Sequence, residues 1–237
     1  MKRKALIIGN SGKPEEYLEG VKKDVQNYNK FLQSNFGGKW YENEIVLSLN
    51  ETKEQVLKKI ENIKKENNDF VFLLFSGHGS YSEWKECRKL YLYDKFIYEQ
   101  ELIYIADKQI TILDTCAGIE NDIPLEKIVV AMESIEQYKF HKDYREIYQE
   151  AIIQCPNQQV KLYSSSINET SQDDSELGGY FAYNLLQVAL SNNEEILNSR
   201  VAYLQAKKIV QEKTNYEQNP QCSCIKSKEI LPFSLGE

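Results

Sequence analysis

Two short segments of the chain carry residues that would act together as a catalytic pair. Residues 72–80 read FLLFSGHGS and contain His78, one of only two histidines in the 237 residues. Residues 112–118 read ILDTCAG and contain Cys116. An imidazole close to a thiol can accept its proton and leave a thiolate, which is a strong nucleophile. The two segments therefore point to nucleophilic catalysis, provided that the fold brings them together.

Both residues follow an apolar run, where the strands of an α/β sheet end. Open parallel sheets bind ligands beyond the carboxyl ends of their strands, so His78 and Cys116 would meet in one crevice. Gly77 and Gly79 allow the backbone to bend sharply and to approach a substrate closely. The amides of Gly79 and Cys116 would then face a developing oxyanion.

Either residue alone has a simpler structural interpretation. A lone cysteine is often a small buried hydrophobic residue, and a histidine after a strand can cap a turn. Matched positions in two glycine turns make the pair far more specific than either residue. A zinc site is disfavoured because His78 and the cysteines lack paired short spacings. A phosphatase-type loop is disfavoured because acidic residues, and no arginine, follow Cys116 closely.

The apolar pattern predicts the elements that position the pair. Four apolar runs are typical of buried strands, at residues 5–9, 44–49, 69–75 and 109–113. Helical spacing predicts a helix over 15–35 that ends at Gly37 and Gly38, and a second helix after Thr52, whose capping box includes Gln55. Because strands and helices alternate, we expect a mostly parallel sheet with helices on its faces.

The second half of the chain predicts further elements of the same kind. We expect a hairpin edge at 90–93, a strand at 160–164, an edge strand at 230–233, and helices at 99–106, 144–155, 179–190 and 199–214. No repeat, low-complexity tract or linker divides the sequence. Residues 1–237 are therefore expected to form a single α/β domain.

The two motifs resemble those of the caspase-fold cysteine peptidases, the group of caspases, metacaspases and their bacterial relatives. The resemblance rests on Phe-Ser-Gly-His-Gly at 75–79 and Asp-Thr-Cys-Ala-Gly at 114–118, in the order of the family. It implies a three-layer α-β-α caspase-like fold with a mostly parallel central sheet flanked by helices. It also implies a cysteine endopeptidase in which Cys116 attacks the peptide and His78 transfers protons.

The resemblance further implies a preference for basic substrates. Asp114 stands where caspases have glutamine and where metacaspases, which cut after Arg or Lys, have aspartate. Asp24, in the segment Gly-Val-Lys-Lys-Asp-Val, resembles the second acidic wall of the metacaspase pocket, and Ser76 is expected to touch the same pocket. Two carboxylates suit a guanidinium or ammonium group and repel an aspartate. We therefore expect protein substrates with Arg or Lys before the scissile bond.

The resemblance extends over nearly the whole chain. The segments 162–166, 178–181, 219–221 and 231–233 resemble the later strand, loop, helix start and C-terminal end of family members. Metacaspases often need calcium, which a cluster of aspartates holds. Asp94, Glu99 and Glu101 lie in the comparable region without a paired-Asp motif. We therefore expect neither a metal nor another cofactor.

Composition restricts the partners and the location. The net charge of −7 argues against a nucleic-acid partner, since phosphate binding favours a basic surface. No apolar run approaches the roughly 18 residues of a membrane span, and the N-terminal run is too short for a signal peptide. Five scattered cysteines predict no disulfide framework. We expect a cytoplasmic protein that binds no membrane.

Two hypotheses on regulation accompany this interpretation. The alternative to an active enzyme is a latent or catalytically silent caspase-fold module that needs an activating partner or a signal, as in bacterial defence or cell death. Self-processing at Lys139, Lys142 or Arg145 is a second hypothesis. A solvated helix face is the simpler interpretation of those basic residues.

Overall fold

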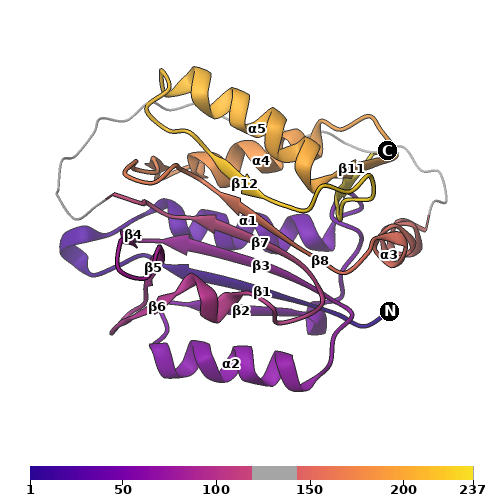
Figure 1. The fold of residues 1–237 in the computed structure, drawn as a ribbon, viewed down its shortest axis with the longest axis horizontal. Coiled ribbons are helices and arrows are strands. Elements are labelled where there is room, and N and C mark those ends of the chain that lie inside the picture. Colours follow the sequence, from indigo (N-terminus) through magenta and orange to yellow (C-terminus); the bar gives the residue numbers. More distant parts are fainter. Residues whose placement is uncertain (119–142, 237) are drawn as a thin grey trace.

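The centre of the molecule is a six-stranded sheet (Figure 1). The computed structural model describes residues 1–118 and 143–236. From one edge of the sheet to the other, the strands are β12 (Gln221–Ser223), β8 (Gln158–Tyr163), β7 (Lys108–Asp114), β3 (Phe70–Gly77), β1 (Arg3–Asn10) and β2 (Ile45–Leu49). All of them run parallel except β12, which pairs antiparallel with β8. The expected mostly parallel sheet is confirmed.

Helices cover both faces of this sheet and complete three layers (Figure 1). One face packs against α1 (Gly20–Gln33), α3 (Tyr144–Gln154), α4 (Tyr180–Leu190) and α5 (Ser199–Lys213). The other face packs against α2 (Lys53–Lys65) and a small antiparallel ribbon of β4 (Gly79–Ser82), β5 (Cys87–Tyr91) and β6 (Phe96–Tyr98). Phe72 and Leu73 of β3 belong to opposite cores, because successive side chains of a strand point to opposite faces. The three-layer α-β-α architecture is confirmed.

The strands and helices that carry the site form for reasons visible in the sequence. Every residue of β3 is buried, as a strand covered on both faces requires. Helix α2 begins with the expected capping box, in which Thr52 Oγ1 accepts a hydrogen bond from the Gln55 amide and Gln55 Oε1 accepts one from the Thr52 amide. Of the helices in the described part of the chain, none combines the length and apolarity that crossing a membrane requires.

Helix α1 is shorter than the expected span of 15–35. A single 3₁₀ turn forms over Pro14–Glu16, and the amide of Leu18 donates to the carbonyl of Ser11 over 2.7 Å. This bond folds residues 11–18 back as a loop, so the helix cannot begin before Gly20. At its other end, Ser34 has extended backbone dihedral angles and donates its hydroxyl to Phe31 O, which ends the helix three residues before Gly37.

The expected helix at 99–106 is only a 3₁₀ turn, Glu99–Leu102. Its continuation is prevented because the amides of Tyr104 and Ile105 donate to the side chains of Gln159 and Gln109 instead of to helix carbonyls. The expected edge strand at 230–233 forms two residues later, as β13 (Pro232–Leu235). It pairs with β11 (Ile196–Asn198) outside the central sheet, whose edge is β12 instead.

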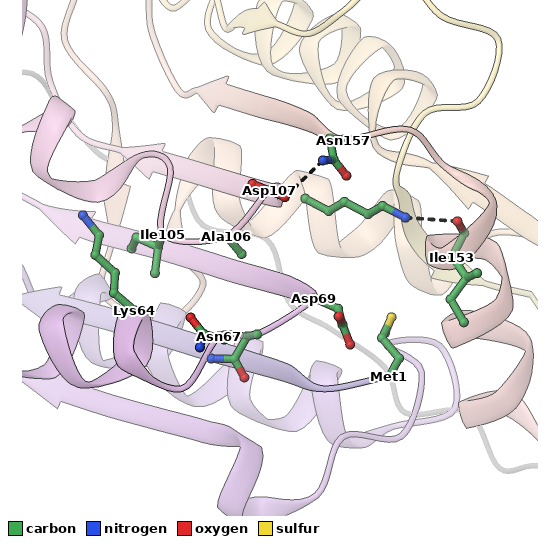
Figure 2. Close-up of a pocket in the computed structure, with 11 residues that line it drawn as sticks. Met1, Lys64, Asn67, Asp69, Ile105, Ala106, Asp107, Ile153 and Asn157 are labelled. Carbon is green, nitrogen blue, oxygen red and sulfur yellow. Dashed lines mark hydrogen bonds between the residues drawn. The ribbon is translucent and has the colours of Figure 1, made fainter.

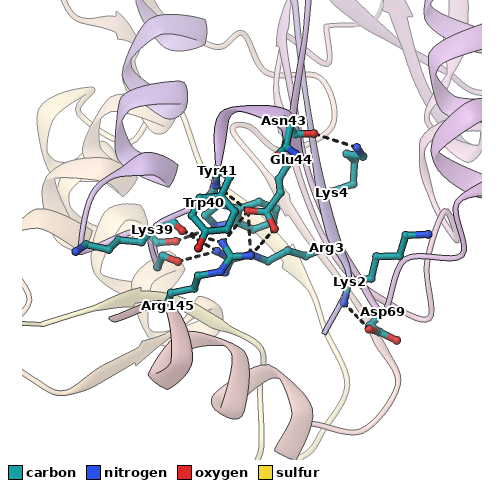
Figure 3. A network of polar contacts seen from close by, with 12 residues as sticks. Lys2, Arg3, Lys4, Lys39, Trp40, Tyr41, Asn43, Glu44, Asp69 and Arg145 are labelled. Atoms are coloured by element: carbon teal, nitrogen blue, oxygen red, sulfur yellow. Dashed lines mark hydrogen bonds and ion pairs between the residues drawn. The ribbon is translucent and has the colours of Figure 1, made fainter. Parts of the chain in front are cut away.

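A half-buried ion network lies at the amino ends of the parallel strands (Figure 3). Arg145 makes a two-pronged contact with Glu44, with nitrogen–oxygen distances of 2.6 and 2.8 Å, and Arg3 approaches the same carboxylate within 3.6 Å. Burial lowers the pKa of Arg3 to about 10. Arg145 therefore joins α3 to Glu44, the residue before β2, and does not lie on a solvated helix face. Lys139 and Lys142, the other two residues considered for self-processing, lie outside the described residues.

Candidate active site

The register of two neighbouring strands brings His78 and Cys116 to the same edge of the sheet. Strands β3 and β7 pair in parallel, with Ser76 opposite Asp114. His78 and Cys116 each lie two residues beyond this pair. Both residues line one cleft of about 670 Å³, which opens beyond the carboxyl ends of the strands. The expected convergence of the two segments is found.

Close packing between the two turns depends on Gly79. A Cβ atom at this position would lie 2.1 Å from Thr115 Oγ1, 2.8 Å from Lys89 O and 3.2 Å from Cys116 O. The first of these distances is far inside van der Waals contact, so a larger residue would push the histidine turn away from the cysteine turn. Gly79 is therefore the residue that lets the two turns touch.

The His78 ring is held by the loop that precedes α1. Its Nε2 atom is within hydrogen-bonding distance of the Glu16 carbonyl oxygen. Gly12, with a φ of +81°, passes so close that a Cβ atom there would lie 2.8 Å from Nε2. In this arrangement Nε2 carries a proton and donates a hydrogen bond to the Glu16 carbonyl, which leaves Nδ1 as the unprotonated nitrogen of a neutral ring.

The Cys116 thiol contacts the loop that follows β8. Its Sγ atom accepts a hydrogen bond from the Ser171 amide over 3.3 Å and lies 3.6 Å from the Ser171 carbonyl. Burial raises the pKa of the thiol, and the nearby carboxylates of Asp114 and Asp173 raise it further. The Ser171 amide and the Arg88 guanidinium lower the pKa and only partly offset burial. Within the described residues Cys116 and His78 form no hydrogen bond with each other.

The ladder geometry beside the pair determines where the Gly79 amide points. Because the Tyr91 amide donates to His78 O, Gly79 and Leu90 form a non-hydrogen-bonded pair of the β4–β5 ladder, and the Gly79 N–H points away from β5. On the cysteine side, the amide of Thr115 is bound to Ser164 Oγ, which fixes the turn. The oxyanion role of the Gly79 and Cys116 amides stays a prediction.

Asp24, Asp114 and Ser76 come together, as the family resemblance implied, but none of the three is among the described residues that line the cleft. The Ser76 hydroxyl donates to Asp24 Oδ2 over 2.6 Å. All three side chains are buried, with exposed fractions of 1% for Asp24, 5% for Asp114 and 2% for Ser76. Burial raises the pKa of Asp24 well above its ordinary value, and the Asp114 carboxylate raises it further. Burial also raises the pKa of Asp114.

The two carboxylates bind the start of helix α4. Asp114 accepts the Ala182 amide over 2.7 Å, and Asp24 accepts the Gly179 amide over 3.1 Å. The N-terminus of a helix attracts negative charge, which stabilises both carboxylates at this place. Gly178 and Gly179 lie directly over them: Cβ atoms there would come within 2.1 Å of Asp24 Oδ1 and 2.4 Å of Asp114 Oδ2. The acidic site is therefore assembled but covered by its own chain.

Sequence reasoning missed two residues of this site. Ser171 contacts both Cys116 and Asp114, the latter through its hydroxyl over 2.7 Å. Arg88 is a buried cation that donates to Ser165 O and contacts the Tyr163 ring face at 4.8 Å. Both lie in polar stretches with no periodic pattern. The signal that would find them is their contact across the fold, which one sequence does not contain.

The three acidic residues considered for calcium are already engaged. Asp94 accepts the Lys53 amide, Glu99 accepts the Arg88 amide, and Glu101 accepts the Tyr98 amide. In residues 1–118 and 143–236 no group of three or more His, Cys, Asp or Glu side chains is placed to hold a metal ion. The expectation that no metal is needed remains a prediction.

A second hollow lies at the opposite end of the strands. This groove has a volume of about 620 Å³ and includes Asp107, which accepts a hydrogen bond from Asn157 over 3.1 Å (Figure 2). Its lining mixes Lys64 with Asp69 and apolar side chains, and contains neither histidine nor cysteine. The chemistry expected from the sequence therefore belongs to the cleft at the carboxyl ends.

Comparison with known proteins agrees with this fold. The Peptidase_C14 family model, described as the caspase domain, matches residues 2–231. Among solved structures, caspase-1 from Spodoptera frugiperda aligns with a TM-score of 0.65 over 94% of this chain and 88% of that chain, at 14% sequence identity. The comparison with curated proteins gives no match. The structural alignment supports a shared fold, and at 14% identity it supports no more than that. The family model identifies the kind of domain.

Proposed function

The chain belongs to the caspase-domain family of cysteine peptidases, and from this premise we propose that it is an endopeptidase that cuts proteins after Arg or Lys. The observation that carries the proposal is the registered pair of strand ends that places His78 and Cys116 on one cleft. In this proposal the protein is cytoplasmic and acts in bacterial defence or cell death.

The proposed reaction has two stages. In the first, Cys116 Sγ bonds to the peptide carbonyl carbon while its proton passes to His78, and the amides of Gly79 and Cys116 stabilise the oxyanion. The C–N bond then breaks, and His78 returns the proton to the leaving amine. In the second stage His78 takes a proton from water as its oxygen attacks the thioester carbon; the C–S bond then breaks, the new carboxyl product leaves, and His78 returns the proton to sulfur to restore the thiol.

The proposed specificity rests on Asp24 and Asp114. Their carboxyl groups lie together with the Ser76 hydroxyl, and Asp114 is joined to the Cys116 thiol through Ser171. A guanidinium or ammonium group entering this site would replace the contacts that now come from the chain itself. It would also favour the ionised form of both carboxyl groups, whose pKa values burial raises in the resting chain.

A second candidate function follows from the same contacts. His78 is bound to Glu16, Cys116 to Ser171, and the acids to the start of α4. These contacts favour a latent form that an activating partner or signal must open. The alternative of a catalytically silent module predicts that no such signal produces cleavage.

The test is hydrolysis of fluorogenic peptides with Arg, Lys or Asp before the cleaved bond, with wild type and Cys116→Ala side by side. Cleavage after Arg or Lys that is lost in the variant supports the peptidase and the acidic site together. Cleavage after Asp would retain the catalytic pair and refute the acidic site. A folded wild-type chain that cuts none of the peptides would favour the latent or silent module.

A further inference from the structure

Gln218 is a buried amide that the proposed mechanism does not use. Its exposed fraction is 1%, and it lies in the turn after α5. The turn itself is anchored: the Gln218 amide donates to Thr214 Oγ1 over 3.2 Å, and the Thr214 hydroxyl donates to Val210 O over 2.8 Å. The C-terminal end of the helix therefore presents this side chain from a fixed support.

The Gln218 side chain forms hydrogen bonds with Ser164, which follows β8, and with Ser171 and Gln172 in the loop that contacts Cys116. Its Nε2 donates to Ser164 O over 2.9 Å and to Ser171 Oγ over 3.2 Å. Its Oε1 accepts the Gln172 amide over 3.0 Å. Both N–H groups of the amide and its oxygen are thus satisfied, which a buried amide requires.

The loops that Gln218 joins are those that hold the nucleophile. Ser164 Oγ accepts the Thr115 amide and donates to the Thr115 carbonyl, both over 3.0 Å, and so fixes the turn that carries Cys116. Ser171 donates its amide to Cys116 Sγ and its hydroxyl to Asp114. A closed circuit of hydrogen bonds therefore runs from Thr115 through Ser164, Gln218 and Ser171 back to Cys116.

We propose that Gln218 is a positioning residue that sets the Ser171 loop against the Cys116 thiol and the Asp114 carboxyl. The expected effect on catalysis rests on the proposed peptidase function. The expected effect on the reactivity of the Cys116 thiol does not depend on that function. Gln218 touches neither the thiol nor the cleft, and acts only through Ser171 and Ser164. A residue that merely stabilised the fold would leave the chemistry of the Cys116 thiol unchanged in folded protein.

The expected direction follows from what the Ser171 amide does. An N–H aimed at sulfur stabilises the thiolate, and Arg88 acts in the same sense, whereas Asp114 and Asp173 oppose it and His78 shares the cleft. When Gln218 no longer fixes Ser171, the thiolate loses its donor while the two carboxylates remain. The pH midpoint of Cys116 alkylation should rise by roughly 0.5–1 unit.

The experiment compares wild type, Gln218→Ala, Gln218→Glu, Ser171→Ala and the double variant Gln218→Ala/Ser171→Ala. The rate of Cys116 alkylation by iodoacetamide is measured against pH, with modified sites read by peptide mass spectrometry. Gln211→Ala is the matched control, because Gln211 Nε2 bonds Asn219 Oδ1 over 2.8 Å beside the same turn without reaching Ser164 or Ser171. Circular dichroism and Tm establish which variants are folded.

We expect both Gln218 variants to shift the alkylation midpoint upward, Gln211→Ala to leave it in place, and the double variant to shift it less than the sum of the single shifts. Where peptides are cleaved, kcat should fall by ~10- to 100-fold. Folded Gln218 variants with the wild-type midpoint would overturn the proposal. If they do not fold, an unshifted midpoint in Ser171→Ala would overturn it. If the wild type cuts no peptide but the Gln218 variants show these shifts, the positioning role stands and the result bears only on the proposed function, where it favours the latent or silent module.

Discussion

Ser76 on β3 and Asp114 on β7 are register partners, and this single pairing sets the positions of His78 and Cys116, the proposed catalytic pair. His78 and Cys116 follow the two partners at the same distance along the chain, so they leave the sheet side by side. The paired residues also belong to the proposed acidic site. In the proposed function, substrate recognition and nucleophilic attack therefore both depend on this one pairing of strands β3 and β7.

The first prediction concerns the nucleophile. Cys116→Ala should abolish peptide cleavage, because no other thiol lines the cleft. The fold should persist, since only the two contacts with Ser171 are lost. Cys155→Ala is the matched control: Cys155 is buried in the α3 side of the core, so its loss should cost about 1–2 kcal/mol of stability and leave cleavage intact. Residual turnover in folded Cys116→Ala would refute the assignment.

The second prediction concerns the contact between the two turns. Gly79→Ala should lower the free energy of unfolding by about 1–3 kcal/mol and eliminate cleavage, because the new Cβ overlaps Thr115 Oγ1 and displaces His78 from the cysteine turn. Gly118→Ala provides the control for stability, since a Cβ there meets no atom of residues 1–118 or 143–236 within 4 Å. Urea unfolding and peptide hydrolysis check both variants. Equal stability of the two variants would contradict the close packing.

The sequence was most informative where one local pattern determines the structure. The apolar runs of β1, β3 and β7 predicted buried strands because each must face a core on both sides. The Thr52–Gln55 capping box predicted the start of α2 because its partners are three residues apart. The sequence also predicted that Asp24 and Asp114 approach one another, although that expectation came from family resemblance.

The features that the sequence did not predict depend on contacts between distant segments. The amide of Leu18 could have belonged to a longer helix, but it is bound to the Ser11 carbonyl, and α1 begins only at Gly20. Ser171 lies 47 positions from Gln218 and 55 positions from Cys116 in the sequence. No local pattern indicates that either pair is in contact. Gly178 covers the Asp24 carboxyl only because α1 and α4 pack against each other in the folded chain. No periodicity or turn chemistry encodes such contacts.

The third prediction concerns substrate choice. Asp114→Asn should reduce cleavage after Arg and Lys by at least tenfold, because a charge-assisted contact is replaced by a neutral one. Hydrolysis after uncharged residues should change much less. Asp107→Asn serves as the control, since Asp107 is exposed at the opposite end of the strands. The ratio of kcat/KM values for basic and uncharged peptides is the measurement, and an unchanged ratio would refute the acidic site.

The fourth prediction uses the buried carboxyl group of Asp24. Its pKa in the folded chain lies well above the ordinary 3.8, chiefly because of burial and then because of Asp114. Between the unfolded and the folded pKa, the folded chain binds more protons than the unfolded chain. Its free energy of unfolding therefore falls as the pH rises through that window.

Asp24→Asn removes this dependence while keeping the contacts, because an amide oxygen can accept from Gly179 and an amide N–H can donate to Ser76. The stability of the variant relative to wild type should therefore be greater at about pH 8 than at about pH 4.5 in urea unfolding. Asp107→Asn is measured alongside as the exposed-site comparison. A variant that tracks wild type at both pH values would show that Asp24 titrates like a solvated carboxyl group. A stabilised variant that also loses cleavage after Arg would show that the chain keeps a destabilising carboxylate for the sake of its substrate.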